Sequence, residues 1–508
     1  METIKALYTK LTDGALINRC ADYAQWTIPA VFPKQLHSGV GNQTVEYDYQ
    51  SMGAMLVNKL ASKLAQTLFP TNTSFFKLQL VTPNGAEENE EVARVISKLE
   101  LAACQLLFRN AEYARIVQAI RLLVVTGNAL LIRTQGSLRV MSLHNYVVRR
   151  NAFGDVLDIV TKESLYAREL APEYAKVLNI DVVQDPERVL ELYTKCCLVY
   201  SDTEGEPPHW LVQQEINGQL IGEESTYPFE LCPYIPVVWG LSTGDNYGRG
   251  IVEEYAGDFI KMSELSAALT TYELESCNVR YVVDPASTLD LKAAQESQTG
   301  DFVSGSPNGV SALELGEFQK IQALSQELQA VFSRLAQAFM YTNNQRDAER
   351  VTAYEIQTNA MEAEEALGGV YSQLSHAMHL PLAYLLCNEV NPQFWAQYLR
   401  GQWQLNIITG MQALGRSAEL QQWLLLTQSI SLVVPTLQQI SPRFNTEKII
   451  DIFMLGHGLS QDGVMLTGRQ LEEKMALYQA QQEATVRQLR QIQSTDDNND
   501  IAASLGTV

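Results

Sequence analysis

Few residues in this chain have the types and spacing of a catalytic or metal-binding group. His376 and His379 form the one metal-like pair, three residues apart in a helical pattern, and the nearby Glu364 and Glu365 lie more than two turns earlier. The chain contains six histidines, and core or surface positions are favoured over a metal site for this pair. A phosphate-binding Gly-x-x-x-x-Gly-Lys-Ser/Thr loop and a Gly-x-Ser-x-Gly nucleophile elbow are both missing from the sequence. We therefore expect no enzymatic activity, metal or cofactor.

The polar segment from Tyr341 to Arg350 is the more informative candidate. It has no apolar period, it carries Arg346 and Arg350, and it ends just before Thr352-Ala353-Tyr354-Glu355, a capping box that starts a helix. Taken alone, the segment is most simply an ordinary exposed connector. Two arginines on an exposed loop are also suited to contact phosphate groups without reading bases. The surrounding elements decide between these interpretations.

Two long helical patterns precede this loop. Apolar residues recur at steps of three and four from Ile251 to Tyr272, and again from Phe318 to Phe339. A helix of roughly 27 residues spans on the order of 40 Å. The apolar residues expected to pack these helices are Tyr255, Phe259, Met262, Leu328 and Leu335.

The region between the two helical patterns has a different character. Val279 to Val283 is β-branched and aromatic, Asp284-Pro285 marks a turn, and Gly300 to Gly305 has the pattern of a second short strand. Ahead of the first helix, Tyr247-Gly248-Arg249-Gly250 is interpreted as a flexible lead-in. The sequence therefore predicts two long helices joined by a small cap that contains strands.

Composition limits the classes of protein that the chain can represent. A chain of 508 residues, 46% hydrophobic and 19% charged, is expected to form two to four folded domains. Its net charge of −21 argues against a protein that grips nucleic acid through a basic surface. Any contact with DNA would have to be local and weak.

The cysteines indicate a reducing compartment. The chain has seven cysteines without a Cys-x-x-Cys spacing, so neither a zinc framework nor a redox motif is indicated. The adjacent Cys196 and Cys197 would point to opposite faces of a strand, and buried free thiols are expected. The N-terminus lacks the apolar core of a signal peptide, and no run of 18 apolar residues is present. A cytosolic protein that does not span a membrane is expected.

The rest of the chain is expected to be α+β and mainly helical. Residues 1–125 show mostly helical patterns, and residues 127–239 show short strands separated by turns. Helices return at 354–371 and 374–387, and residues 401–492 are expected to be almost wholly helical. The tail from about residue 493 is polar and is expected to be disordered.

Several segments resemble the head-to-tail connectors, or portal proteins, of Autographiviridae-type podoviruses. Examples are Cys232-Pro233-Tyr234-Ile235-Pro236 and Glu349-Arg350-Val351-Thr352-Ala353. The matching segments follow the order of that family from about residue 15 to 475. They are residues 49–54, 58–64, 68–70, 124–131, 146–154, 232–236, 247–250, 253–255, 298–303, 349–353 and 367–371.

The resemblance implies a viral portal fold and a division of the chain. Its parts are a wing (1–245, with helices at 352–400), stem helices (246–278 and 318–341), an α/β clip (279–317), a channel loop (342–351), a helical crown (401–492) and an unmatched tail (493–508). The loop residues that would face DNA are Asn343, Asn344, Gln345, Arg346, Asp347, Glu349 and Arg350. The clip residues that would contact terminase or adaptor are Asp284, Asp290, Lys292, Asp301 and Phe302.

The resemblance also implies the partners. A ring of about twelve copies would stand at one capsid vertex as a conduit for double-stranded DNA, packaged by the terminase and later ejected through the tail. The terminase large subunit, a tail adaptor, the capsid, the scaffold and internal core proteins would be its partners. The protein would be made in the host cytoplasm and end in the virion, without membrane contact.

Two alternatives belong to other classes. Another phage head–tail component, such as a tail adaptor, would usually be much shorter and would not need two long helices around a cap. A helical hydrolase would have to use His376 and His379 with nearby carboxylates, and it would lose activity when both histidines become alanine. A closed ring with a channel wider than duplex DNA would distinguish the portal from both.

Overall fold

A computed structural model gives the fold of the chain. It describes residues 3–34, 45–70, 74–80, 90–108, 112–134, 136–181, 184–200, 207–277, 280–286, 288–304, 309–313, 318–341, 361–362, 364–393, 396 and 405–409. The chain divides into two compact units, residues 1–417 and 418–508, and every described residue belongs to the first. The predictions for most of the crown and for the tail therefore lie outside the described residues.

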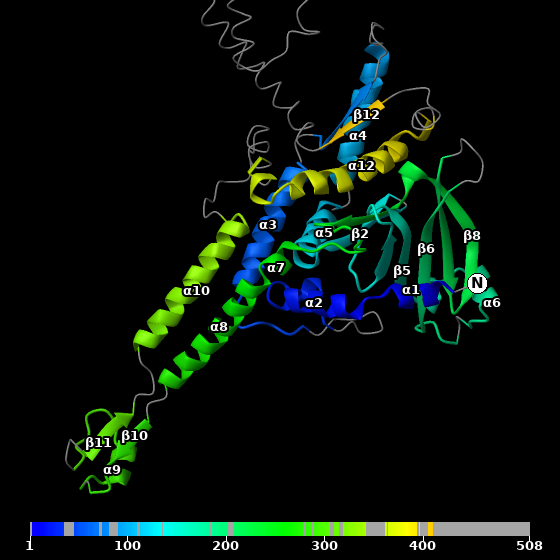
Figure 1. Cartoon of the computed structure of the whole chain (residues 1–508). Coiled ribbons are helices and arrows are strands. Elements are labelled where there is room, and N and C mark those ends of the chain that lie inside the picture. The colour runs from blue at the N-terminus through cyan, green and yellow to red at the C-terminus, as the bar shows by residue number, and fades with distance from the viewer. Residues whose placement is uncertain are drawn as a thin grey trace, which may run out of the picture. The chain divides into compact units, whose positions relative to one another are not determined.

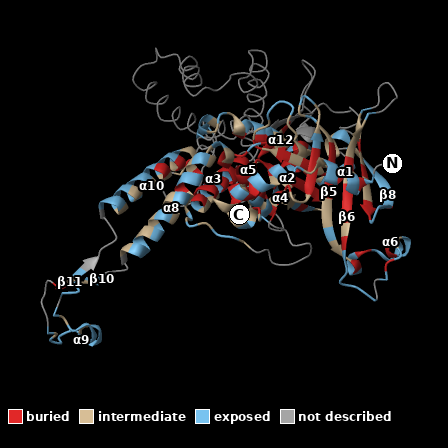
Figure 2. Cartoon of the chain, turned by 60° about the horizontal axis from the view of Figure 1, so that its bottom comes forward, coloured by how far each residue is buried: buried red, intermediate tan, exposed pale blue. Residues whose placement is uncertain are grey.

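A group of helices forms the centre of the hydrophobic core. Helix α5 (Glu112–Thr126) is buried along most of its length, and its neighbours α2 (Gly14–Gln25) and α3 (Met52–Leu68) bury their apolar faces beside it. Helices α4 (Glu90–Phe108) and α12 (Val370–Val390) pack against each other and complete this group. Figure 2 shows the buried residues concentrated around α3, α5 and α12. The helical patterns in these regions are confirmed, with shifted ends.

Two antiparallel sheets continue from this core (Figure 1). One has the order β3-β2-β9 and contains β2 (Asn128–Thr134), β3 (Ser137–Met141) and β9 (Tyr234–Val238). The other follows sequence order from β4 to β8. Its strands are β4 (Tyr146–Arg150), β5 (Val156–Tyr166), β6 (Val189–Val199), β7 (His209–Ile216) and β8 (Gln219–Pro228). The short helix α6 (Pro172–Val177) lies between β5 and β6 in the chain.

One strand contradicts the prediction that residues 401–492 are almost wholly helical. Strand β12 (Leu405–Thr409) pairs antiparallel with β1 (Phe76–Leu80), with Leu78 opposite Ile407. The run Ile407-Ile408-Thr409 is β-branched and suits a pleated strand. Its partner lies far away in the sequence, so local periodicity could not reveal the pairing.

The stretch between the two long helices also differs from its prediction. Strand β10 (Arg280–Val283) pairs with β11 (Val310–Leu313), and the short helix α9 (Leu291–Glu296) lies between them in the chain. The predicted strand at 300–305 is wrong in its described part, because residues 300–304 belong to no strand or helix. A backbone bond from Asp301 N to Gln298 O, 3.0 Å, closes a turn there instead.

His379 on α12 is buried in the core and should make the stability of the fold depend on pH. Its ring lies 4.9 Å from the Phe69 ring and 5.1 Å from the Phe75 ring, and its Nδ1 pairs with Ser375 Oγ at 3.0 Å. Burial lowers its pKa from 6.5 to about 3. The folded chain therefore holds a neutral imidazole over a pH range in which the unfolded chain binds a proton. This contribution to stability is complete above pH 6.5 and is lost as the pH falls towards 3.

We predict that acidification to pH 5 costs about 2 kcal/mol through this one residue. His379→Leu should remove that part of the pH dependence of the urea midpoint. His376→Ala is the matched control, because His376 is exposed on the same helix, and it should leave the dependence unchanged. An unchanged pH profile in His379→Leu would show that His379 does not couple stability to pH.

Candidate functional site

The two long helices pair along part of their length and join the core at one end. Helix α7 (Ile251–Glu254) leads into α8 (Ala256–Cys277), and α10 (Phe318–Ala338) runs beside α8 in both cartoon views (Figures 1 and 2). Among the five predicted packing residues, the structure buries Phe259, Met262 and Leu335 and leaves Tyr255 and Leu328 half-buried.

Aromatic rings fix the core end of this pair. The Phe339 ring lies edge-on to the Phe259 ring at 5.6 Å and to the Tyr255 ring at 6.2 Å. Ion pairs reinforce the contact from outside: Arg334 reaches Asp258 at 2.7 Å, and Lys261 pairs with Glu327. These pairs lie at the surface, where water and salt screen their attraction. The buried rings, not the surface charges, set the packing of the two helices.

The lead-in to α7 is clamped rather than flexible. A Cβ atom added at Gly250 would lie 2.8 Å from Gly127 N, and one at Gly248 would lie 2.9 Å from Gly240 O. Neither residue is among those with positive φ, so the glycines are needed because two backbones pass in contact. The buried Asn128 side chain fastens this approach, since its amide donates to Gly248 O and accepts from Gly248 N, both at 2.8 Å. The interpretation of a flexible lead-in was wrong.

Strand β4 holds the same lead-in from a second side. Asn246 Oδ1 accepts a hydrogen bond from Arg150 N at 2.8 Å, and Arg150 Nε donates to Asn246 O at 3.1 Å. The Tyr247 hydroxyl accepts from Val148 N at 3.2 Å. Three segments that each carried the resemblance, 124–131, 146–154 and 247–250, therefore meet at one place. Sequence reasoning found all three segments but gave no reason for them to meet.

The acidic cap residues each bond to nearby backbone. Asp284 Oδ1 accepts from Ala286 N at 2.9 Å, and Asp301 Oδ2 accepts from Gln298 N at 2.7 Å. Asp290 caps α9 by accepting from Lys292 N at 3.1 Å and Ala293 N at 3.4 Å. These carboxylates form the turns and the helix start of the cap.

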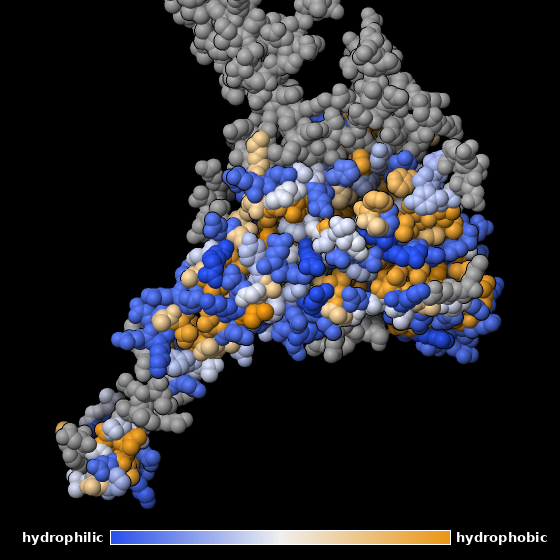
Figure 3. Space-filling model, in the orientation of Figure 1, coloured by the Kyte–Doolittle hydropathy of each residue, from blue (hydrophilic) through white to orange (hydrophobic). Residues whose placement is uncertain are grey.

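Aromatic and aliphatic side chains provide the open surface of the cap. Phe302 is fully exposed, and Tyr281, Val282 and Leu291 are also exposed. Lys292 is exposed too, on the first turn of α9. Figure 3 shows the hydrophobic colour on the outside of this region. Among the predicted clip residues, Phe302 and Lys292 are therefore the side chains most available to a partner.

Several predicted features lie outside the described residues or do not come together. All seven predicted loop residues, Asn343, Asn344, Gln345, Arg346, Asp347, Glu349 and Arg350, lie outside the described residues. His376 is exposed while His379 is buried in the core, so the pair does not share one face. Within the described ranges, no three His, Cys, Asp or Glu side chains are grouped to hold a metal ion, and no helix is long and apolar enough to cross a membrane.

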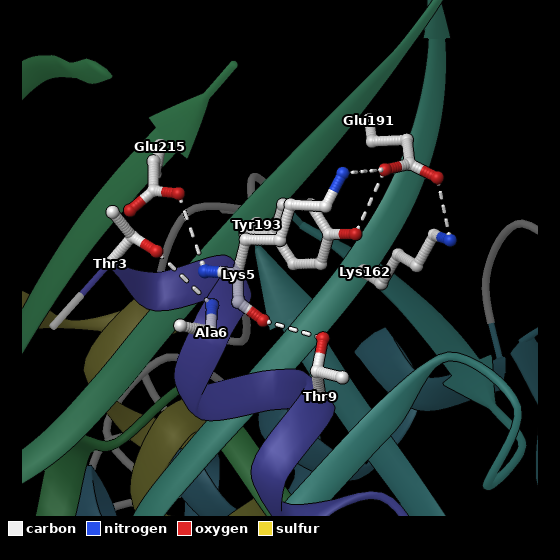
Figure 4. Close-up of polar contacts among 8 residues, drawn as sticks. All are labelled: Thr3, Lys5, Ala6, Thr9, Lys162, Glu191, Tyr193 and Glu215. Carbon is white, nitrogen blue, oxygen red and sulfur yellow. Dashed lines mark hydrogen bonds and ion pairs between the residues drawn. The ribbon is translucent and has the colours of Figure 1, made fainter. Parts of the chain in front are cut away.

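A polar cluster at the N-terminus was not singled out from the sequence (Figure 4). Helix α1 (Ile4–Leu11) packs on the five-stranded sheet, and the Glu215 carboxylate accepts from Ile4 N at 2.5 Å and Lys5 N at 3.3 Å. Glu191 accepts from Lys162 Nζ at 2.7 Å and also from Lys5 and Tyr193. The hydrogen bond from Lys162, aided by the other two donors, lowers the Glu191 pKa to about 2. These contacts satisfy the free amides of α1 and fix it to the sheet.

Curated relatives align with nearly the whole chain. The portal protein of Pseudomonas phage phiKMV is 38% identical over 497 residues, which cover 95% of this chain and 96% of that protein. The portal protein of Escherichia phage T7 is 32% identical and covers 93% of this chain and 90% of its own length. The portal protein of Enterobacteria phage SP6 is 30% identical, with 82% and 80% covered.

Two solved structures of gene transfer agent (GTA) particles match the chain at a low level. A chain of the neck of an empty GTA particle matches with a TM-score of 0.39, 13% identity, and 81% and 90% of the two chains covered. A chain of the virion of a native gene transfer agent particle matches with a TM-score of 0.38 and 12% identity, over 80% and 90%.

The family comparison spans most of the chain. The family model described as bacteriophage head to tail connecting protein matches residues 2–465. Together with relatives that are 30–38% identical over most of their length, this match confirms the resemblance inferred from the sequence. The chain belongs to the bacteriophage head-to-tail connecting protein family.

Proposed function

We propose that this chain assembles with further copies of itself into a portal ring of about twelve subunits, through which double-stranded DNA is packaged and later ejected. Membership of the head-to-tail connecting family makes the chain a structural component of the phage particle. In the proposed ring, residues 1–245 and 352–400 form the wing, α8 and α10 the stem, residues 279–317 the clip, 342–351 the channel loop and 401–492 the crown. The alignment with portal proteins over nearly the whole chain is the observation that carries this proposal.

The surface of the helix pair supports association between copies. Beyond the buried rings at the core end, α8 exposes Ile260 and Leu274, and most of α10 is exposed or half-buried. A two-helix hairpin with so little core of its own gains stability when neighbouring hairpins cover its sides. Head-to-tail contacts that close on themselves produce a ring.

The charge of the chain suits a conduit in which DNA slides. A net charge of −21 gives little general attraction for phosphates, and tight phosphate binding would stall movement in either direction. Arg346 and Arg350 lie in the proposed channel loop, where a ring would repeat each of them once per subunit. Asp347 and Glu349 beside them would moderate the attraction.

Electron cryomicroscopy of the purified full-length protein tests the ring. Closed rings with a channel wider than duplex DNA are expected in top views. A protein that stays monomeric at assembly concentrations, alone and together with scaffold and capsid proteins, would contradict the proposal.

The loop arginines should matter for DNA and not for assembly. We predict that Arg346→Ala with Arg350→Ala leaves ring formation intact and lowers DNA packaging or retention several-fold, because the rings of positive charge are lost. The control is the double change to lysine at the same positions, which keeps the charge and should retain most packaging. Normal packaging by the alanine variant would make the loop a passive connector.

The exposed aromatic residue of the clip should matter for partner binding. We predict that Phe302→Ser weakens binding of the ring to the terminase large subunit or to the tail adaptor by about tenfold, because buried aromatic anchors dominate such interfaces. Phe153→Ser is the control, since Phe153 is also exposed but lies on the β4–β5 turn. Equal affinities of Phe302→Ser and the unchanged ring would remove Phe302 from the contact.

A further inference from the structure

We propose that Cys196 and Cys232 form a dithiol site that a small-molecule disulfide oxidises to an intramolecular disulfide bond. The two sulfur atoms lie 3.8 Å apart, although the residues are 36 positions apart in the chain. A disulfide bond holds its sulfur atoms at about 2.05 Å, so each side chain needs to move by only about 1 Å. This site is separate from the helix pair and the cap.

The two cysteines belong to different parts of the fold. Cys196 is on β6, where it lies opposite Ile159 of β5 and Val212 of β7. Cys232 follows the short 3-10 turn η4 (Phe229–Leu231), and only Pro233 separates it from β9 of the three-stranded sheet. The bond would therefore tie a central strand of the five-stranded sheet to the entry of the three-stranded sheet.

Local contacts aim the two sulfurs at each other. The Cys232 thiol also lies 3.3 Å from Tyr234 O, to which it can donate, and this contact restricts its rotation. The neighbouring Cys197 faces the other side of β6, where its thiol donates to Leu211 O at 3.7 Å. Only one of the two adjacent cysteines is thus placed to react with Cys232.

Burial decides the order of the chemical steps. Cys232 is partly exposed and meets the oxidant first, whereas Cys196 is buried. The Cys232 thiolate attacks one sulfur of oxidised glutathione, forms a mixed disulfide and releases one glutathione thiolate. The Cys196 thiolate then attacks Cys232 Sγ and releases the second glutathione. The two thiol protons end on the two glutathione molecules, the cysteines lose two electrons, and oxidised glutathione gains them.

The second step should be slow and should depend on pH. The pKa of Cys196 is raised by its hydrogen bond with Cys232 and by burial, so little thiolate forms at neutral pH. A reducing glutathione pool keeps such a pair as thiols, while an oxidising medium favours the disulfide. We therefore expect the Cys196–Cys232 disulfide to form only after the protein leaves a reducing compartment.

Peptide mapping of the full-length protein tests the proposal. The protein is incubated at pH 8 with oxidised glutathione, its free thiols are alkylated, and it is digested with a glutamyl endopeptidase, because no Lys or Arg separates Cys196 from Cys232. The expected product is one disulfide-linked pair of peptides containing Cys196 and Cys232. In denaturant, five of the seven cysteines (7 − 2 = 5) should remain available for alkylation. Faster formation at pH 9 than at pH 7 is also expected.

Two variants provide the matched comparison. Cys197→Ser should keep the link, and Cys232→Ser should abolish it. After oxidation, the unchanged protein should unfold at a temperature about 5 °C higher than oxidised Cys232→Ser, because the bond restricts the unfolded chain. The proposal is overturned if both cysteines remain alkylatable, if Cys232 links to Cys197, or if the link joins different chains. Cys196 and Cys197 share one glutamyl peptide, so fragmentation of the linked peptides between these two residues identifies which one is bonded to Cys232. Non-reducing gel electrophoresis separates a link within one chain from a link between chains. Both measurements use the unchanged protein and decide these outcomes even where a variant fails to fold.

Discussion

Replacing Arg133 with methionine is expected to destabilise the protein by about 3–5 kcal/mol, because the change leaves buried carboxylate charge without a partner. Arg133 on β2 donates to Glu112 of α5 at 2.9 Å and to Glu389 of α12 at 2.9 and 3.0 Å. The side chains of Arg133 and Glu112 are only 3% and 4% exposed. The three residues tie a strand and two helices together at a point where water cannot replace the lost charge.

An exposed ion pair gives the control for Arg133. Arg168 pairs with Glu187 at 2.6 Å, but both side chains are more than half exposed, so Arg168→Met should cost about 0–1 kcal/mol. Adding Glu112→Gln to Arg133→Met should recover part of the loss, because the amide removes one of the uncompensated charges. Urea unfolding followed by tryptophan fluorescence measures all three variants. A loss no larger for Arg133→Met than for Arg168→Met would show that the buried pair does not hold the core together.

Local patterns in the sequence predicted elements with a strong period. The apolar steps of three and four at 251–272 correspond to α7 and α8, which the structure divides at Tyr255, and those at 318–339 correspond to α10. One face of α8 and of α10 is buried at the core end. The run from Val279 to Val283 corresponds to β10 in the same way. These helices and this strand could be predicted because the apolar period or the β-branched run lies within the residues of the element itself.

Pairings between distant segments could not be predicted from such patterns. Strand β12 depends on β1, and β11 on β10, and no short window of sequence contains both partners. The aspartates of the cap were named as residues that would contact terminase or adaptor, whereas Asp290 directly precedes α9 and acts as its N-cap. That role has a local signal, since aspartate is a preferred N-cap residue, and this signal could have been used.

The close backbone contact between Gly127 and the segment 247–250, which leads into α7, could not be predicted from the sequence. A glycine permits either unusual backbone angles or close contact with another chain segment, and sequence alone does not separate the two uses. Gly248 and Gly250 serve close contact with Gly127, which itself has φ of +76°. The two uses of glycine can be separated by experiment. A Gly→Ala change should lower the free energy of unfolding more where a backbone contact is close than where only a positive φ is required.

Gly127→Ala is expected to be among the most damaging single changes of a small residue in this chain. The added Cβ would lie 2.5 Å from Arg249 C and Gly250 N and 2.7 Å from Gly248 O, all of which are backbone atoms. The positive φ costs about 1–2 kcal/mol for an L-residue, and overpacking adds about 1–3 kcal/mol or more. A total loss of about 3 kcal/mol in the free energy of unfolding is therefore expected, measured by urea denaturation.

Gly218→Ala separates the two causes of that loss. Gly218, in the turn between β7 and β8, has φ of +79° but nothing within 4 Å of an added Cβ, so it should lose only the conformational part, about 1–2 kcal/mol. Gly257→Ala, at an open position of α8, should gain up to about 1 kcal/mol. If Gly127→Ala and Gly218→Ala lose the same free energy of unfolding, the backbone of residues 247–250 moves to make room for the added methyl group. A clearly larger loss, combined with fewer closed rings, would mean that the position of α7 and α8 on the core is fixed by this contact and that ring assembly depends on it.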